Sequence, residues 1–140
     1  MKKISLLFLS LFVAAVSFAQ RTATYYPVSA YHRSADSRWE WIKVTGTSDE
    51  LPKIIFYFNG SSDALSSLDR VEIDNKWQDV FIFPYKGIPA DDGKGIQFTV
   101  FDKESKKLKI ELYFYEDPVK HFDFYIRYRN IEYTYRVLNN

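Results

Sequence analysis

The sequence contains no cysteine, two histidines and one methionine among its 140 residues. Without cysteine the chain forms no disulfide bond and performs no thiol chemistry. Two histidines are also a poor ligand set for a transition metal. A strong charge of either sign is missing as well, since 19 Lys and Arg oppose 18 Asp and Glu for a formal net charge of +1. This balance gives no bulk electrostatic reason to bind nucleic acid or an anionic membrane, and we expect neither as a partner.

The single long apolar run stands at the start of the chain. Two lysines precede an apolar segment over residues 4–18, and Ser17 and Ala19 place small side chains ahead of a cleavage point. This order is typical of a secretory signal peptide, and the run is shorter than the roughly 20 residues that span a bilayer. We therefore expect a signal peptide at residues 1–19, with an uncleaved N-terminal anchor as the alternative. Because no cysteine follows the run, a lipid anchor on cysteine is excluded.

The remaining residues, 20–140, are expected to form a single β domain in the periplasm or outside the cell. Cleavage removes two lysines, so the formal net charge falls from +1 to −1. No second apolar segment approaches membrane-spanning length. The oligomeric state stays open, because the edge strands of a sheet are either covered by another chain or protected locally.

Aromatic residues are abundant, at 19% of the chain, and in the C-terminal third they alternate with polar residues. The alternation covers residues 107–115 and 121–129 and resumes over 131–137. Its apolar side carries Leu108, Ile110, Leu112, Phe114, Phe122, Phe124, Ile126, Tyr128, Ile131, Tyr133, Tyr135 and Val137. A period of two predicts half-buried antiparallel strands. The last two segments read as a hairpin that turns near Arg129–Asn130.

Further strands are predicted upstream by short apolar runs between turn signals. Asn59–Gly60 is a strong turn signal, and Asp74–Asn75–Lys76 reads as a tight hairpin. The runs cover residues 22–31, 38–45, 53–59, 70–74, 76–84 and 95–102. Residues 62–68 have room for one helical turn. Eight or nine short strands predict an all-β fold, an antiparallel β-sandwich, with a small up-and-down β-barrel as the alternative.

Catalytic residues have little support in the sequence. His32, Ser34 and Asp36 fall in one short polar loop, whereas a catalytic triad needs a buried shell that orients its members. His121 begins a predicted strand and is expected at the surface. The acidic residues lie mostly at predicted turns, where Asp is favoured for backbone reasons, so paired carboxylates of a glycosidase cannot be recognised. We expect a protein that is not an enzyme.

A calcium site is suggested only in part by "ADDGKG", Ala90–Gly95. The segment contains the Asp-Gly element of a calcium loop but lacks the full ligand pattern and its closing glutamate. A glycine turn between strands explains it better. We therefore expect no metal and no cofactor.

Two aromatic surfaces are candidates for binding. If the strand over 38–45 is regular, Trp39 and Trp41 share one side and Ile42 and Val44 face the core. Exposed tryptophan rings stack on sugars or anchor partner proteins; the alternative places at least one tryptophan in the core. The second surface carries Tyr113, Tyr115, Tyr125, Arg127, Arg129 and Arg136. Tyrosine beside arginine is typical of binding surfaces, and also of ordinary cross-strand pairs.

Two segments give the chain a resemblance to known proteins. The leader "MKKISLLFLSLFVAAVSFAQ" resembles those of exported proteins from Bacteroidota bacteria. The stretch "GKGIQFTVFDKESKKLKIELYF" with the tyrosine-rich last strand is similar to small exported all-β proteins of unassigned function from those bacteria. The resemblance implies export and an all-β fold, and it brings no catalytic residues.

The sequence thus predicts an exported, non-enzymatic binding or interaction domain that uses an aromatic-rich sheet face. Trp39, Trp41, Tyr125 and Arg127 are the expected binding residues. An envelope protein or a surface polysaccharide is the expected partner. One alternative is a small-molecule carrier, since a barrel of about eight strands has room for one ligand. The other is an extracytoplasmic hydrolase.

Overall fold

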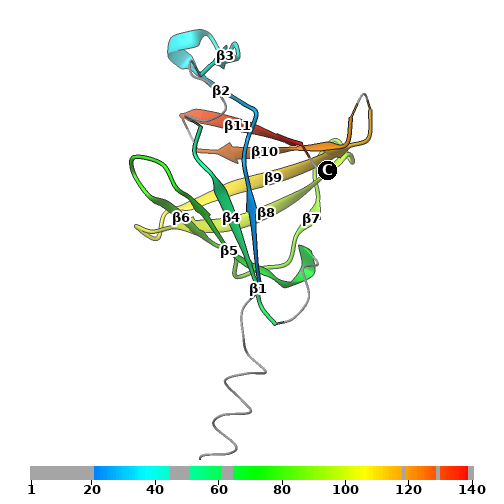
Figure 1. The fold of residues 1–140 in the computed structure, drawn as a ribbon. Helices are drawn as coiled ribbons and strands as arrows, with labels where there is room; N and C mark the ends of the chain where they lie inside the picture. The colour runs from blue at the N-terminus through cyan, green and yellow to red at the C-terminus, as the bar shows by residue number, and fades with distance from the viewer. Residues whose placement is uncertain (1–20, 45–50, 61–64, 118, 129, 139–140) are drawn as a thin grey trace, which may run out of the picture.

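A computed structural model describes residues 21–44, 51–60, 65–117, 119–128 and 130–138, and these form one curled antiparallel β-sheet (Figure 1). The predicted signal peptide lies outside the described residues and stays a prediction. In the part of the chain that is described, no helix has the length and apolar character needed to cross a membrane.

Eleven strands make up the described sheet, in the order β1-β4-β5-β6-β8-β9-β10-β11-β2-β3, with β7 paired to β8. Their bounds are β1 Arg21–Tyr25, β2 Ser29–Ser34, β3 Ile42–Lys43, β4 Ile54–Phe58, β5 Leu68–Ile73, β6 Asp79–Ile82, β7 Ile88–Pro89, β8 Gly95–Asp102, β9 Lys107–Tyr115, β10 His121–Arg127 and β11 Ile131–Leu138. Two short 3-10 turns, η1 Ala35–Ser37 and η2 Leu65–Ser67, complete the described elements. The predicted all-β antiparallel fold is confirmed, with more strands than the eight or nine expected.

The sheet curls so far that its two halves pack against each other. Phe56 on β4 contacts Phe122 and Phe124 on β10, with ring centroids 6.1 and 5.9 Å apart, although four strands separate β4 from β10 in the sheet order. The result is a half-barrel in which one continuous sheet encloses the core. It combines the single sheet of the predicted barrel with the facing layers of the predicted sandwich.

A corner at Pro27 joins the two halves. β1 pairs with β4 in one half, and β2 pairs with β11 in the other. Only Tyr26–Val28 separate them, and Val28 donates its backbone N–H to the carbonyl of Arg136 at 2.9 Å. The predicted strand over 22–31 is therefore one extended segment that changes partners at a buried proline, which has no N–H to give to a ladder.

The C-terminal alternation is confirmed by β9, β10 and β11. Their apolar side faces the core, except for Phe114, which is 50% exposed. The backbone N–H of Tyr128 donates to Ile131 at 3.0 Å and closes the predicted hairpin, although Arg129 lies outside the described residues. The expected surface position of His121 is wrong. It is buried because β10 begins beside the end of β9, where its ring stacks on Tyr115 at 4.8 Å.

The predicted regular strand over 38–45 is also wrong. The chain forms η1 and then passes through Arg38 and Trp39, whose φ angles of 56° and 59° are left-handed. Only β3 remains as a strand, so Ile42 is 45% exposed instead of being a core residue, while Val44 packs partly against the core. The helical turn predicted within 62–68 is present as η2, and residues 61–64 lie outside the described residues.

Candidate functional site

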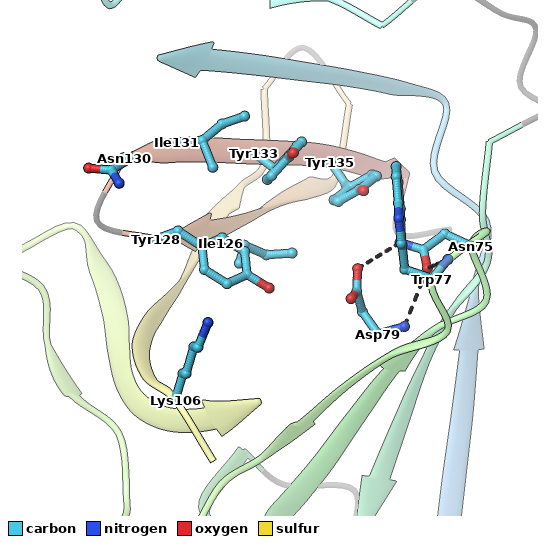
Figure 2. Close-up of a pocket in the computed structure, with 10 residues that line it drawn as sticks. All are labelled: Asn75, Trp77, Asp79, Lys106, Ile126, Tyr128, Asn130, Ile131, Tyr133 and Tyr135. Atoms are coloured by element: carbon cyan, nitrogen blue, oxygen red, sulfur yellow. Dashed lines mark hydrogen bonds between the residues drawn. The ribbon is translucent and has the colours of Figure 1, made fainter. Parts of the chain in front are cut away.

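Three hairpins meet at one end of the half-barrel and surround a pocket of about 510 Å³ (Figure 2). The β5–β6 hairpin contributes Trp77 and Asp79, the β8–β9 hairpin contributes Lys106, and the β10–β11 hairpin contributes tyrosines. We call this space the mouth pocket. Its volume lies within the range of roughly 300–1,000 Å³ that small-molecule sites occupy.

The mouth pocket has an apolar floor and a polar rim. Ile126 and Tyr135 are 2% and 9% exposed and form the floor from β10 and β11. Tyr128 and Tyr133 are half-buried, and their rings meet edge to face at 6.5 Å. Trp77 stands at the rim with 65% of its surface exposed. A ligand in the mouth pocket would contact aromatic rings at the floor and water at the rim.

Asn75 fixes the acidic side of the pocket. Its Oδ1 accepts the backbone N–H groups of Trp77 and Asp79 at 3.1 and 3.3 Å, which is how Asn stabilises a turn. Its Nδ2 donates to Oδ2 of Asp79 at 2.8 Å. Among the described residues, the other oxygen of Asp79 accepts no hydrogen bond. The Asn75 amide thus holds Oδ2 of Asp79 in place, and Oδ1 of Asp79 is left to accept a hydrogen bond from a ligand.

The pocket tyrosines keep their protons at any physiological pH. Burial raises the pKa of Tyr135 to about 12, and the nearby Asp79 carboxylate adds to the effect. The pKa values of Tyr128 and Tyr133 are raised by burial first and by the same carboxylate second. Each hydroxyl can therefore donate a hydrogen bond to a ligand.

The outer face of the sheet brings together three of the four predicted binding residues. Trp41 meets Tyr125 at 5.9 Å between ring centroids, and the Arg127 guanidinium lies 5.1 Å from the Tyr125 ring. Arg33 stacks 4.4 Å over Trp41. We call these four residues the outer-face cluster. Trp39 is 46% exposed, but it belongs to the left-handed turn before β3 and makes none of these ring contacts.

The arginines of the outer face are held by carboxylates. Arg127 donates to Glu111 at 2.5 Å and lies 2.8 Å from Glu132, which also accepts from Arg33 at 2.6 Å. Glu111 is 7% exposed, so the side of the sheet predicted to be wet is partly buried. Its burial follows from the pairing of β9 with β10, which sets Glu111 beside Tyr125 and next to Arg127.

A second ion pair on this face joins Arg136 to Asp123. Arg136 makes two hydrogen bonds to the Asp123 carboxylate at 2.9 and 3.1 Å. Asp123 is 4% exposed. This bidentate pair lies beside Trp41 and Tyr125 in a shallow hollow of about 220 Å³. Its charges satisfy each other, as expected for a structural pair.

The other sequence candidates do not line the mouth pocket. Ser34 accepts a hydrogen bond at its backbone carbonyl from Ser37, as part of the η1 turn, and His32 faces Tyr133 at 6.4 Å. Around Asp92 the chain forms the predicted glycine turn, with the Asp92 carboxylate accepting the N–H of Lys94 at 3.0 Å. In the described ranges no group of three or more His, Asp or Glu could hold a metal ion.

Sequence reasoning did not find the mouth pocket as a site. The sequence pattern predicts that the tyrosines of β11 face inward, and it suggests a carrier only through the room inside a barrel, without naming lining residues. Trp77 and Asp79 belong to one hairpin, whereas Tyr133 lies more than 50 residues later on β11, and they meet because the sheet curls. Comparisons of the chain with protein-family models, with curated proteins and with solved structures give no match.

Proposed function

We propose that this chain is an exported binding protein that carries a small organic ligand in the mouth pocket. The observation that carries the proposal is an aromatic hollow of about 510 Å³ with fixed polar groups at its wall. Concave sites that combine apolar lining with a few oriented polar groups are the usual form of ligand pockets. Export rests on the predicted signal peptide.

The proposal is tested by filling the pocket. Ile131→Trp places a large ring in the lining, and we expect it to abolish binding of the neutral dye Nile red. Ile82→Trp is the matched control, because Ile82 is 43% exposed and lies outside the pocket. Fluorescence titration gives the affinity, and native mass spectrometry of the purified protein reports any ligand that is carried along. Equal dye binding by both variants, with no carried ligand, would refute the carrier function.

Partner binding through the outer-face cluster is the second candidate function. The observation in its favour is the contact between Trp41 and Tyr125 beside two arginines. Tryptophan, tyrosine and arginine dominate the energetics of protein interfaces. An envelope protein or surface polysaccharide that is captured by the native protein and lost with Trp41→Ala would support this function. Capture that is unaffected by Trp41→Ala would count against it.

A further inference from the structure

The more buried of the charges that line the mouth pocket is a carboxylate. In the part of the chain that the structure describes, the charged lining residues are Asp79 and Lys106. Lys106 is 75% exposed at its side chain and pairs with Glu104 at 3.5 Å, so its charge is offset at the rim. Asp79 is half-buried and is held by a neutral amide, which leaves its negative charge without a cationic partner among the described residues.

The pKa values of the pocket tyrosines are shifted in the direction that a nearby negative charge produces. The electrostatic effects on Tyr128, Tyr133 and Tyr135 all raise their pKa values, with Asp79 acting on each of the three. On the outer face the pKa values of Tyr125 and Tyr113 are also raised, by burial first, but there the positive charge of Arg127 partly opposes the nearby acidic groups. Asp79 is therefore the charge that the three pocket tyrosines share, and no arginine opposes it there as Arg127 does on the outer face.

The aromatic walls fit a positive charge as well. The faces of Trp and Tyr rings carry a negative quadrupole that attracts cations, and ammonium groups are bound by cages of such rings. Tyr128, Tyr133 and Tyr135 supply rings from the β10–β11 hairpin, and Asp79 adds a full charge from the β5–β6 hairpin, beside Trp77 (Figure 2). Ile126 and Ile131 leave an apolar area for the rest of the ligand.

We propose that the mouth pocket binds an organic ammonium cation with an apolar body, its charge lying between the Asp79 carboxylate and the tyrosine rings. This inference rests on the proposed carrier function and names the chemical class of its ligand. A free amine and a quaternary ammonium share this chemistry, and the probes below separate them.

The test compares probes that differ in charge but share a benzyl group: benzyltrimethylammonium, benzylamine, benzyl alcohol and benzenesulfonate. Isothermal titration of the whole exported domain measures each affinity. We expect both cations to bind at least about tenfold more tightly than the alcohol, because a desolvated charge pair outweighs a neutral contact. The sulfonate should not bind, and added salt should weaken only the cations. Tighter binding of benzyltrimethylammonium than of benzylamine would assign a quaternary ligand, and the reverse a free amine.

Two variants locate the charge. Asp79→Asn keeps the shape and the acceptor for Asn75, and it should weaken the cations about tenfold while leaving benzyl alcohol unchanged. Asp91→Asn removes the same charge on the outer side, beside Glu111 and Arg127, and should change nothing. Tyr133→Leu removes an aromatic face and should weaken the cations more than the alcohol.

The outcomes separate this inference from the carrier function. Equal affinities for cation, alcohol and anion, or cation binding unaffected by Asp79→Asn, would overturn the ammonium assignment while the carrier function stands. Absence of binding for all four probes would also overturn it. In that case the carrier function would still be supported if Ile131→Trp, but not Ile82→Trp, lost Nile red binding. If the Nile red test also failed, both the ammonium assignment and the carrier function would be refuted.

Discussion

Arg127 is held between two carboxylates, and this decides the result of removing it. Arg127→Ala would leave Glu111, whose side chain is 10% exposed, as a buried charge without its partner. Removing one member of a largely buried ion pair is strongly destabilising, and since the Arg127 side chain is 24% exposed, we expect a loss of about 1–3 kcal/mol. Trp41→Ala removes ring contacts at the surface and should cost about 0.5–1 kcal/mol.

Urea unfolding of the two variants measures both values. The comparison matters for the outer-face cluster, because a loss of partner binding in Arg127→Ala would be mixed with a loss of stability. Trp41→Ala is the cleaner variant for any binding experiment. Equal free energies of unfolding for Arg127→Ala and the unchanged protein would mean that the pair with Glu111 contributes nothing.

Strands β8 and β9 approach each other closely at Gly95. A Cβ atom at this position would lie 2.8 Å from the backbone carbonyl oxygen of Leu112 and 2.7 Å from the ring of Tyr113. Gly95→Ala should therefore cost about 1–3 kcal/mol through overpacking. Thr99→Ala, on the same strand, is the control and should cost less than about 1 kcal/mol. Thermal unfolding, followed by circular dichroism, measures the midpoints of both variants. An unchanged midpoint for Gly95→Ala would show that β9 shifts to accommodate the methyl group at little cost.

The elements differ in how far the sequence could predict them. β9 was predicted to its end residues because its alternation is uninterrupted. The prediction of a regular strand over 38–45 was wrong because Arg38 and Trp39 adopt left-handed φ angles, which these residue types do not indicate. Trp39 was therefore grouped with Trp41, although only Trp41 reaches Tyr125. The mouth pocket could not be predicted, since it depends on the curl that brings three hairpins together.

The whole molecule is expected to unfold in a single transition. The Pro27 corner ties β1 to β2, and β2 pairs with β11 through contacts such as Ile131 with Ser34, at opposite ends of the sequence. The two halves share one core, in which Phe56 and Phe124 are 3% and 0% exposed. A small domain with one shared core usually unfolds cooperatively. Tryptophan fluorescence and far-ultraviolet circular dichroism should therefore give coincident urea transitions.

A double-mutant cycle tests whether the curl is what joins the halves. Phe56→Ala and Phe124→Ala should each cost about 3–5 kcal/mol, because both remove buried rings. Phe114→Ala is the matched control and should cost far less, since Phe114 is 50% exposed. The two core rings lie 5.9 Å apart, so the double variant should lose about 0.5–1.5 kcal/mol less than the sum of the single losses. Strict additivity, or a separate transition for each half, would show that β4 and β10 do not pack together in solution, and the mouth pocket would then lose the curl that forms it.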